Sequence, residues 1–219
     1  TPSAMRWGIG VTIVLSCIIG LIALSVTWQQ MPYHGLELVA IGILCVIFAF
    51  LYTTKLSYLG WGDVLVLVFF GLVPVCGTYY LQAFTIDYGS IVLSLIAGVA
   101  IDALLVINNY RDRDQDKISG KQTLIVRYGE RFGNRLYLGI GIVVMVHICL
   151  LAPVVGSFLS NAALVVIVVI YYILHSNAWK KMTEIREGRA LNQILGLTSR
   201  NMFLLAVMVA AALLLTPHS

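Results

Sequence analysis

Seven long apolar stretches constrain the fold of this chain more than any other feature. They run over residues 7–28, 36–52, 64–81, 88–107, 136–155, 161–174 and 194–215. A membrane-spanning helix needs about 20 mostly apolar residues, whereas a strand of a membrane barrel needs about 10 with strict alternation. None of the stretches alternates strictly. The pattern therefore predicts an all-α, polytopic transmembrane helical bundle of about seven spans, with residues 1–219 forming a single transmembrane domain.

The composition excludes an ordinary water-soluble globule. Hydrophobic residues make up 60% of the chain and charged residues only 11%, against roughly 25% charged residues in soluble domains. The four cysteines lie in different apolar stretches without C-x-x-C spacing, so neither a metal knuckle nor a disulfide framework is indicated. We expect a lipid bilayer around the protein and no nucleic-acid partner.

All 14 Lys and Arg residues fall on one side of the predicted membrane. They precede the first span, or lie between the second and third, the fourth and fifth, and the sixth and seventh spans. Basic loops remain in the cytoplasm during insertion. The charge distribution thus supports the count of seven spans and predicts that these loops are cytoplasmic.

The most informative segment begins at the end of the fourth span. If that helix continues, Asn108, Asp112 and Asp116 recur every four residues and form one row of oxygen ligands. Mg²⁺ takes one or two carboxylates from a protein together with water and substrate phosphate oxygens. The two aspartates repel each other on an unliganded helix and gain from a cation. The row favours a site for Mg²⁺ and diphosphate, and the alternative is a solvated, charge-mixed loop.

Four basic residues are candidates for binding the diphosphate, because guanidinium and ammonium groups complement phosphate charge. They are Arg111, Lys121, Arg127 and Lys55. Gly120 supplies a turn that folds Lys121 back toward the acidic row.

Four further polar residues are candidates for an acceptor site or cavity: Tyr52, Asp63, Asp102 and Asn109. Asp102 lies inside the fourth span, near the azimuth of Asn109, and either lines the cavity or forms a polar pair within the bundle. Asp63 either binds the acceptor or caps the third helix. Tyr52 either lines the cavity mouth or belongs to an interfacial aromatic belt.

Two sequence patterns carry a family resemblance. Asn-Asn-x-Arg-Asp-x-x-x-Asp at residues 108–116 and Gly-Lys-x-Thr-Leu-x-Val-Arg-x-Gly at residues 120–129 resemble the second aspartate-rich motif of the UbiA superfamily of intramembrane prenyltransferases. Residues 59–63, 68–71 and 77–82 are similar to the menaquinone branch of that superfamily. The resemblance implies an enzyme of the bacterial cytoplasmic membrane that uses Mg²⁺ to transfer a polyprenyl group from polyprenyl diphosphate to 1,4-dihydroxy-2-naphthoate. The acceptor is decarboxylated, giving demethylmenaquinone, and Asn108, Asp112 and Asp116 are the implied catalytic metal ligands.

The resemblance also implies nine spans around a central cavity, with a first aspartate motif between the second and third family helices. No such motif precedes Trp7. We therefore expect this chain to correspond to family helices three to nine, with the N-terminal helices and the first motif missing. Two alternatives remain: a related prenyltransferase with another aromatic acceptor, such as 4-hydroxybenzoate or homogentisate, and a membrane transporter. Transporters usually show broken helices in two related halves, whereas the polar residues here gather in one loop.

Overall fold

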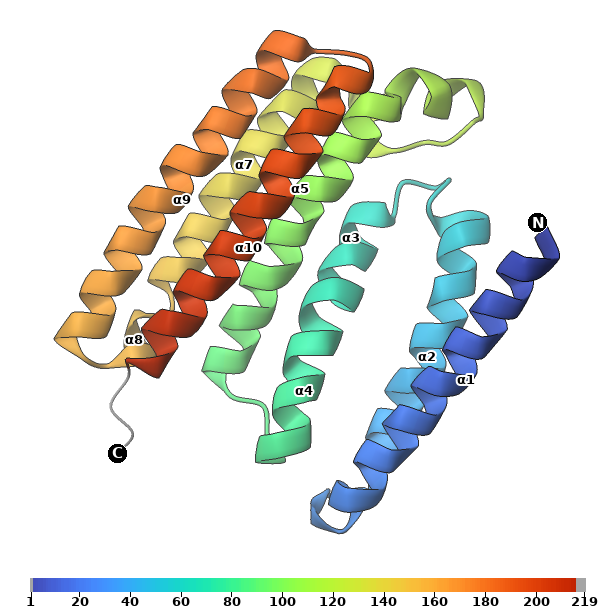
Figure 1. Ribbon diagram of the computed structural model, residues 1–219, viewed down its shortest axis with the longest axis vertical. Coiled ribbons are helices and arrows are strands. Elements are labelled where there is room, and N and C mark those ends of the chain that lie inside the picture. Colours follow the sequence, from blue (N-terminus) through green and yellow to red (C-terminus); the bar gives the residue numbers. More distant parts are fainter. Residues whose placement is uncertain (1, 216–219) are drawn as a thin grey trace.

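The computed structural model describes residues 2–215, and within that range the chain folds into helices without a strand (Figure 1). The long helices are α1 (Pro2–Thr27), α2 (Leu36–Leu51), α5 (Tyr88–Ile118), α7 (Glu130–Cys149), α9 (Phe158–Ile185) and α10 (Asn192–Leu214). A further long segment is built from α3 (Gly62–Val66), the π-helical η3 (Leu67–Leu72) and α4 (Val73–Ala83). The short elements are η1 (Trp28–Gln30), η2 (Tyr52–Leu56), α6 (Leu124–Tyr128), α8 (Ala152–Val155) and η4 (Arg189–Leu191).

The structure confirms the predicted all-α bundle with seven helical segments long and apolar enough to span a membrane. Several helices are longer than the apolar stretches that predicted them. The fourth span continues to Ile118 instead of ending at residue 107, and the sixth continues to Ile185 instead of residue 174. The fifth begins at Glu130, six residues early. Hydropathy marks only the part of a helix that crosses hydrocarbon, while backbone hydrogen bonding continues through polar residues outside it.

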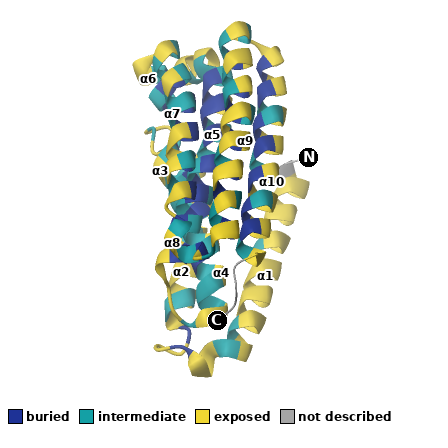
Figure 2. Ribbon diagram, turned by 90° about the vertical axis from the view of Figure 1, so that its left-hand side faces the viewer, coloured by how far each residue is buried: buried dark blue, intermediate teal, exposed yellow. Residues whose placement is uncertain are grey.

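Helix α5 is the centre of the bundle and packs against η3, α4, α7 and α10. It begins with a capping box, in which the Asp87 carboxylate accepts the Ser90 N–H and the Ser90 hydroxyl accepts the Asp87 N–H. Its 31 residues give a length of about 46 Å. Figure 2 shows the buried residues concentrated along α5 and on the facing sides of its neighbours.

Two glycines set the distance between η3 and α5. A Cβ atom on Gly71 would lie 2.5 Å from the Ser94 carbonyl oxygen and 2.7 Å from the Gly98 Cα. A Cβ atom on Gly98 would lie 2.9 Å from the Leu67 carbonyl oxygen. These distances are too short for any side chain, so the two backbones are in direct contact here.

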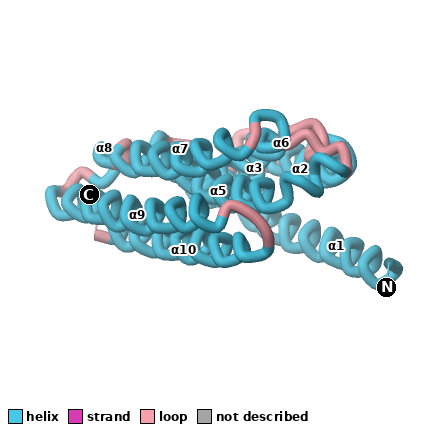
Figure 3. The backbone as a smooth tube through the Cα atoms, turned by 90° about the horizontal axis from the view of Figure 1, so that it is seen from above, coloured by secondary structure: helices cyan, strands magenta, loops and turns pink. Residues whose placement is uncertain are grey.

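Helices α1 and α2 stand at the edge of the bundle, and their described residues include none that is buried. Helix α1 projects away from the other helices (Figure 3). At the upper end of Figure 1 lie η2, the loop between α5 and α7 and the loop between α9 and α10; together with the adjoining ends of α5, α7 and α9, they hold most of the Lys and Arg residues. We call this the basic end of the bundle.

Candidate active site

The acidic row lies on the last turns of α5, at the basic end. Because α5 is continuous through Ile118, Asn108, Asp112 and Asp116 follow one another along one face, as the spacing predicted. Asn108 is exposed, Asp112 is partly exposed and the Asp116 side chain is only 13% exposed. The row therefore passes from an open surface into a more enclosed part of the molecule.

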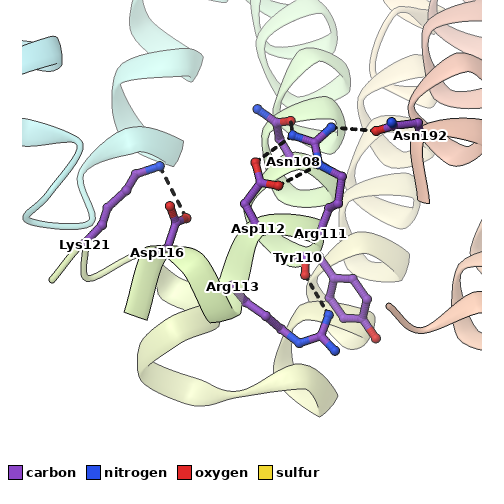
Figure 4. Close-up of polar contacts among 8 residues, drawn as sticks. All are labelled: Asn108, Tyr110, Arg111, Asp112, Arg113, Asp116, Lys121 and Asn192. Carbon is purple, nitrogen blue, oxygen red and sulfur yellow. Dashed lines mark hydrogen bonds and ion pairs between the residues drawn. The ribbon is translucent and has the colours of Figure 1, made fainter. Parts of the chain in front are cut away.

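Arg111 holds the first two members of the row in place (Figure 4). Its guanidinium donates to both carboxylate oxygens of Asp112, at 2.7 and 2.6 Å, and to the Asn108 side-chain oxygen at 2.7 Å. It also donates to the side-chain oxygen of Asn192, at the start of α10, at 2.7 Å. A fork of this kind fixes carboxylate orientation better than a single bond does, so α10 contributes to the geometry of the row through Arg111.

Lys121 approaches the row from the loop that follows α5. Gly120 adopts a φ of +79°, in the left-handed region, and this turn brings the Lys121 Nζ atom to 3.4 Å from an Asp116 carboxylate oxygen. The predicted return of Lys121 toward the row is therefore confirmed, and the two side chains face each other in Figure 4. The Lys121 charge also acts on Asp112.

A small pocket lies beside Lys121 and brings together three of the four predicted acceptor residues. Tyr52, Asp63 and Asn109 line it together with Lys121. The remaining lining residues are Ser57, Gly60, Gly62, Leu105 and Thr123. The pocket is thus formed by η2, α3, α5 and the loop after α5, and it joins the candidate acceptor residues to the acidic row through one lysine.

The structure excludes one of the two interpretations of Asp63, and acceptor binding stays a prediction. Asp63 is the second residue of α3, the N-cap position belongs to Trp61, and no side chain caps this helix. The capping interpretation is therefore wrong: the Asp63 side chain lines the pocket instead.

Asp102 lies deeper on the same face of α5, two turns before Asn109. One of its carboxylate oxygens is buried and makes no hydrogen bond, so the second alternative, a polar pair within the bundle, is not seen among residues 2–215. Asp102 does not line the pocket. A cavity-lining role for Asp102 stays a prediction.

The loops at the basic end are tied together by hydrogen bonds. The Arg127 guanidinium donates to the Leu59 carbonyl oxygen at 2.8 Å, and the Gln122 N–H donates to the Tyr58 carbonyl oxygen at 2.9 Å. Arg127 therefore holds the loop before α3 against the loop after α5, and it does not contact the acidic row in this structure. Lys55, in η2, is exposed and forms no ion pair within the described residues. Diphosphate binding by either residue stays a prediction.

The opposite side of α5 is held by a second polar network around Glu130. The Glu130 carboxylate accepts from the Tyr110 hydroxyl at 3.0 Å and from the Arg186 guanidinium at 3.0 Å. Arg113 lies 3.9 Å from the same carboxylate and donates to the carbonyl oxygens of Tyr110 and Arg186. This network joins α5, α7 and the end of α9, and so fixes the helix end that carries the row.

Sequence reasoning missed two residues that shape the site. Asn192 lies 81 positions from its partner Arg111, and no local pattern signals such a contact. Thr123 is buried, lines the pocket and caps α6 by accepting the Val126 N–H. A threonine directly before a short apolar run is a recognisable cap signal. Thr123 could therefore have been predicted from the sequence more easily than Asn192.

The donor set of the row suits a hard divalent cation that is shared with a phosphate. Asp112, Asp116 and Asn108 offer oxygen donors only, which Mg²⁺ prefers. Within residues 2–215 no group of three or more His, Cys, Asp or Glu side chains is arranged to hold a metal ion. Two carboxylates agree with Mg²⁺ bound together with phosphate oxygens, and not with a cage made by the protein alone. The assignment of these ligands stays a prediction.

The fold and the site describe a polytopic membrane protein with an acidic, phosphate-compatible site at one end of its bundle. Comparison with protein families agrees with that class: residues 1–207 match the UbiA prenyltransferase family. This chain belongs to the UbiA prenyltransferase family, and it is an integral, multi-pass membrane protein.

Several relatives are naphthoate prenyltransferases. The chain is 36% identical over 159 residues to the 1,4-dihydroxy-2-naphthoate octaprenyltransferase of Haemophilus influenzae, covering 71% of this chain and 51% of that protein. It is 32% identical over 223 residues to the protein of the same name from Mycobacterium tuberculosis, covering 97% of this chain and 69% of that protein. The chain spans about half the length of most of the relatives it matches best. No solved structure matches the chain.

Proposed function

We propose that this chain takes part in the Mg²⁺-dependent transfer of a polyprenyl group from polyprenyl diphosphate to 1,4-dihydroxy-2-naphthoate. The observation that carries the proposal is the position of Lys121, which pairs with the acidic row and also lines the pocket that contains Asp63. A diphosphate at the row and an aromatic ring bound against the residues of the pocket would therefore be neighbours. The relatives named as 1,4-dihydroxy-2-naphthoate octaprenyltransferases support the choice of acceptor.

The acidic row would bind the leaving group. Asp112 and Asp116, with Asn108, would hold Mg²⁺, which supplies positive charge to the departing diphosphate when bound. Lys121 and Arg111 form ion pairs with the two carboxylates in this structure. Once Mg²⁺ is bound, both side chains would be free to contact the diphosphate, and Lys55 and Arg127 would provide further positive charge. The allylic C–O bond breaks and its electron pair leaves with the diphosphate. The surrounding apolar helices exclude water, which would quench the allylic cation.

The pocket would orient the acceptor. Asp63 would accept a hydrogen bond from a ring hydroxyl and increase the electron density of the ring, while Tyr52 and Asn109 would fix its position. The ring carbon that bears the carboxylate forms the new C–C bond, and carbon dioxide leaves while its electron pair restores the aromatic ring. The product is the reduced form of demethylmenaquinone, so the proposal places the chain in menaquinone biosynthesis.

We further propose that the protein lies in the bacterial cytoplasmic membrane with its basic end in the cytoplasm. The Lys and Arg residues gather in the loops and helix ends on that side of the seven spans, with Arg200 inside the last span. The positive-inside rule assigns such an end to the cytoplasm. Both substrates are anionic, and a cationic face attracts them.

The proposal is tested in membranes from cells that produce the chain, with naphthoate labelled at its carboxyl carbon. Polyprenyl diphosphate should release labelled carbon dioxide and form the prenylated product in the presence of Mg²⁺, and a chelator should stop both. Asp112→Asn or Asp116→Asn should lower kcat by roughly 100-fold or more, because the Mg²⁺ that would neutralise the leaving group loses an anionic ligand. The matched control is Asp114→Asn, since Asp114 is an exposed residue of the same helix and lies off the row.

Full turnover by both row variants would remove these ligands from the mechanism. If the chain prenylates 4-hydroxybenzoate in preference to the naphthoate, the proposed prenyl transfer stands but the proposed acceptor is wrong.

A further inference from the structure

A second cavity lies on the far side of α5 from the pocket, between α7 and α9. Its apolar part is lined by Leu138, Ile142 and Met145 of α7 and by Tyr172 and Ile173 of α9. Leu138, Ile142 and Met145 recur along one face of α7, so the lining forms a groove parallel to the helix axes. A groove of this kind on the outside of a membrane bundle faces the hydrocarbon of the bilayer. We call it the α7–α9 groove.

Polar side chains gather where the groove approaches the basic end. The rest of its lining comes from α9: His175, Ser176, Asn177, Trp179 and Lys180. The Trp179 ring N–H donates to the Asn134 carbonyl oxygen of α7 at 3.2 Å, so this indole bridges the two helices at the polar end. Trp is the residue that membrane proteins place at the level of the lipid headgroups. The lining of the groove thus changes from apolar to polar at the depth where a phospholipid changes from acyl chains to headgroup.

Two cations stand at the polar end without an anionic partner. Lys180 is exposed and lines the groove. Arg135 is exposed and lies one turn before Leu138, on the same face of α7. The Trp179–Asn134 hydrogen bond places these two residues at the same height. Neither forms an ion pair within residues 2–215.

From this arrangement we infer that the α7–α9 groove binds one anionic phospholipid. An acyl chain lies along Leu138, Ile142 and Met145, and the headgroup phosphate lies between Lys180 and Arg135. The charge complementarity selects an anionic lipid over a zwitterionic one, because each cation near the membrane surface attracts net negative charge. The groove shares no lining residue with the pocket at Asp63, so this lipid is distinct from the isoprenoid substrate proposed above.

Trp179 provides a direct test, because bromine atoms quench an indole only at short range. The other three tryptophans, Trp7, Trp28 and Trp61, are exposed and are replaced by Phe. The chain is then placed in phosphatidylcholine vesicles in which a fixed fraction of lipid is dibrominated phosphatidylglycerol or dibrominated phosphatidylcholine. Brominated phosphatidylglycerol should quench Trp179 more strongly at equal mole fraction.

Charge variants separate the groove from general surface charge. Lys180→Gln and Arg135→Gln should each lower the preference for phosphatidylglycerol by about fivefold. Lys181→Gln is the matched control, since Lys181 is an exposed neighbour of equal charge that does not line the groove, and it should leave the preference unchanged. As a second measurement, native mass spectrometry of the chain with all its tryptophans should show one retained phosphatidylglycerol, which Lys180→Gln removes.

Three results would overturn the inference. Equal quenching by the two brominated lipids would show that the groove does not select charge. An equal loss in the Lys181→Gln variant would assign the preference to the surface as a whole. Recovery of fluorescence on addition of polyprenyl diphosphate would show that the groove holds the isoprenoid tail instead.

Discussion

Replacing Gly71 by alanine tests the contact on which the walls of the pocket depend. The added Cβ atom would lie 2.5 Å from the Ser94 carbonyl oxygen and 2.7 Å from the Gly98 Cα, whereas ordinary carbon contacts begin near 3.5 Å. Because both opposing atoms belong to the backbone, η3 must move away from α5 by roughly 1 Å. Overpacking of this kind costs about 1–3 kcal/mol of stability.

The same displacement should reduce catalysis. Segment η3 continues directly from α3, which carries Asp63, while Leu105 and Asn109 on α5 form the opposite wall of the pocket. A misplacement of 1 Å between reacting groups costs on the order of 100-fold in rate. Gly71→Ala is therefore expected to lower both the stability of the bundle and prenyl transfer.

Cys76 reports on the opening of this interface. It is buried in α4, and its thiol contacts the Ser90 carbonyl oxygen of α5 at 3.7 Å. In a variant that keeps Cys76 as its only cysteine, maleimide labelling over a temperature series measures when α4 separates from α5. Gly71→Ala should lower the labelling midpoint. Gly77→Ala is the matched control in the same segment, because nothing lies within 4 Å of its added Cβ atom.

If Gly71→Ala labels Cys76 at the same midpoint as the wild-type chain and the control, the direct backbone contact between η3 and α5 is refuted.

Two further perturbations follow from the loops at the ends of α5. The Ser90 N–H holds the pKa of the Asp87 carboxyl below its ordinary value, so the cap stabilises the fold fully above about pH 4 and less as the pH falls through the lowered pKa. Asp87→Asn should keep most of the cap and remove this loss, as measured by thermal unfolding at pH values above and below that range. Lys121→Gln should raise KM for polyprenyl diphosphate by about 10-fold or more, because a charge-assisted contact is lost. Lys117→Gln, in the exposed last turn of α5, should leave KM unchanged. An unchanged KM in the Lys121→Gln variant would show that Lys121 does not bind the diphosphate.

The transmembrane architecture could be read from the sequence because each span is a long apolar run bounded by charged loops. The row on α5 could also be read, since a four-residue spacing places side chains on one face of any helix that continues. The Gly120 turn belongs to the same kind of local signal. These predictions depend only on residues that are close together in the chain.

Contacts between distant segments could not be read in this way. Arg111 is held by Asn192, and Arg127 binds the Leu59 carbonyl oxygen, and both contacts depend on how the helices pack. The position of Asp63 before an apolar run favours a cap, and only the tertiary structure shows that Asp63 lines the pocket. The sequence also did not predict how far the helices extend beyond the hydrocarbon core of the membrane, because polar residues give no hydropathy signal.

The length of α5 has a consequence for how an apolar substrate would reach the protein. Asp112 lies about 36 Å along the axis from Tyr88, and the hydrocarbon core of a bilayer is about 30 Å thick. The carboxylates therefore lie just beyond the acyl chains. This is the depth at which an isoprenoid diphosphate would have its charged group in water and its tail in the hydrocarbon. The polyprenyl diphosphate proposed above would then arrive by lateral diffusion and react without leaving the leaflet.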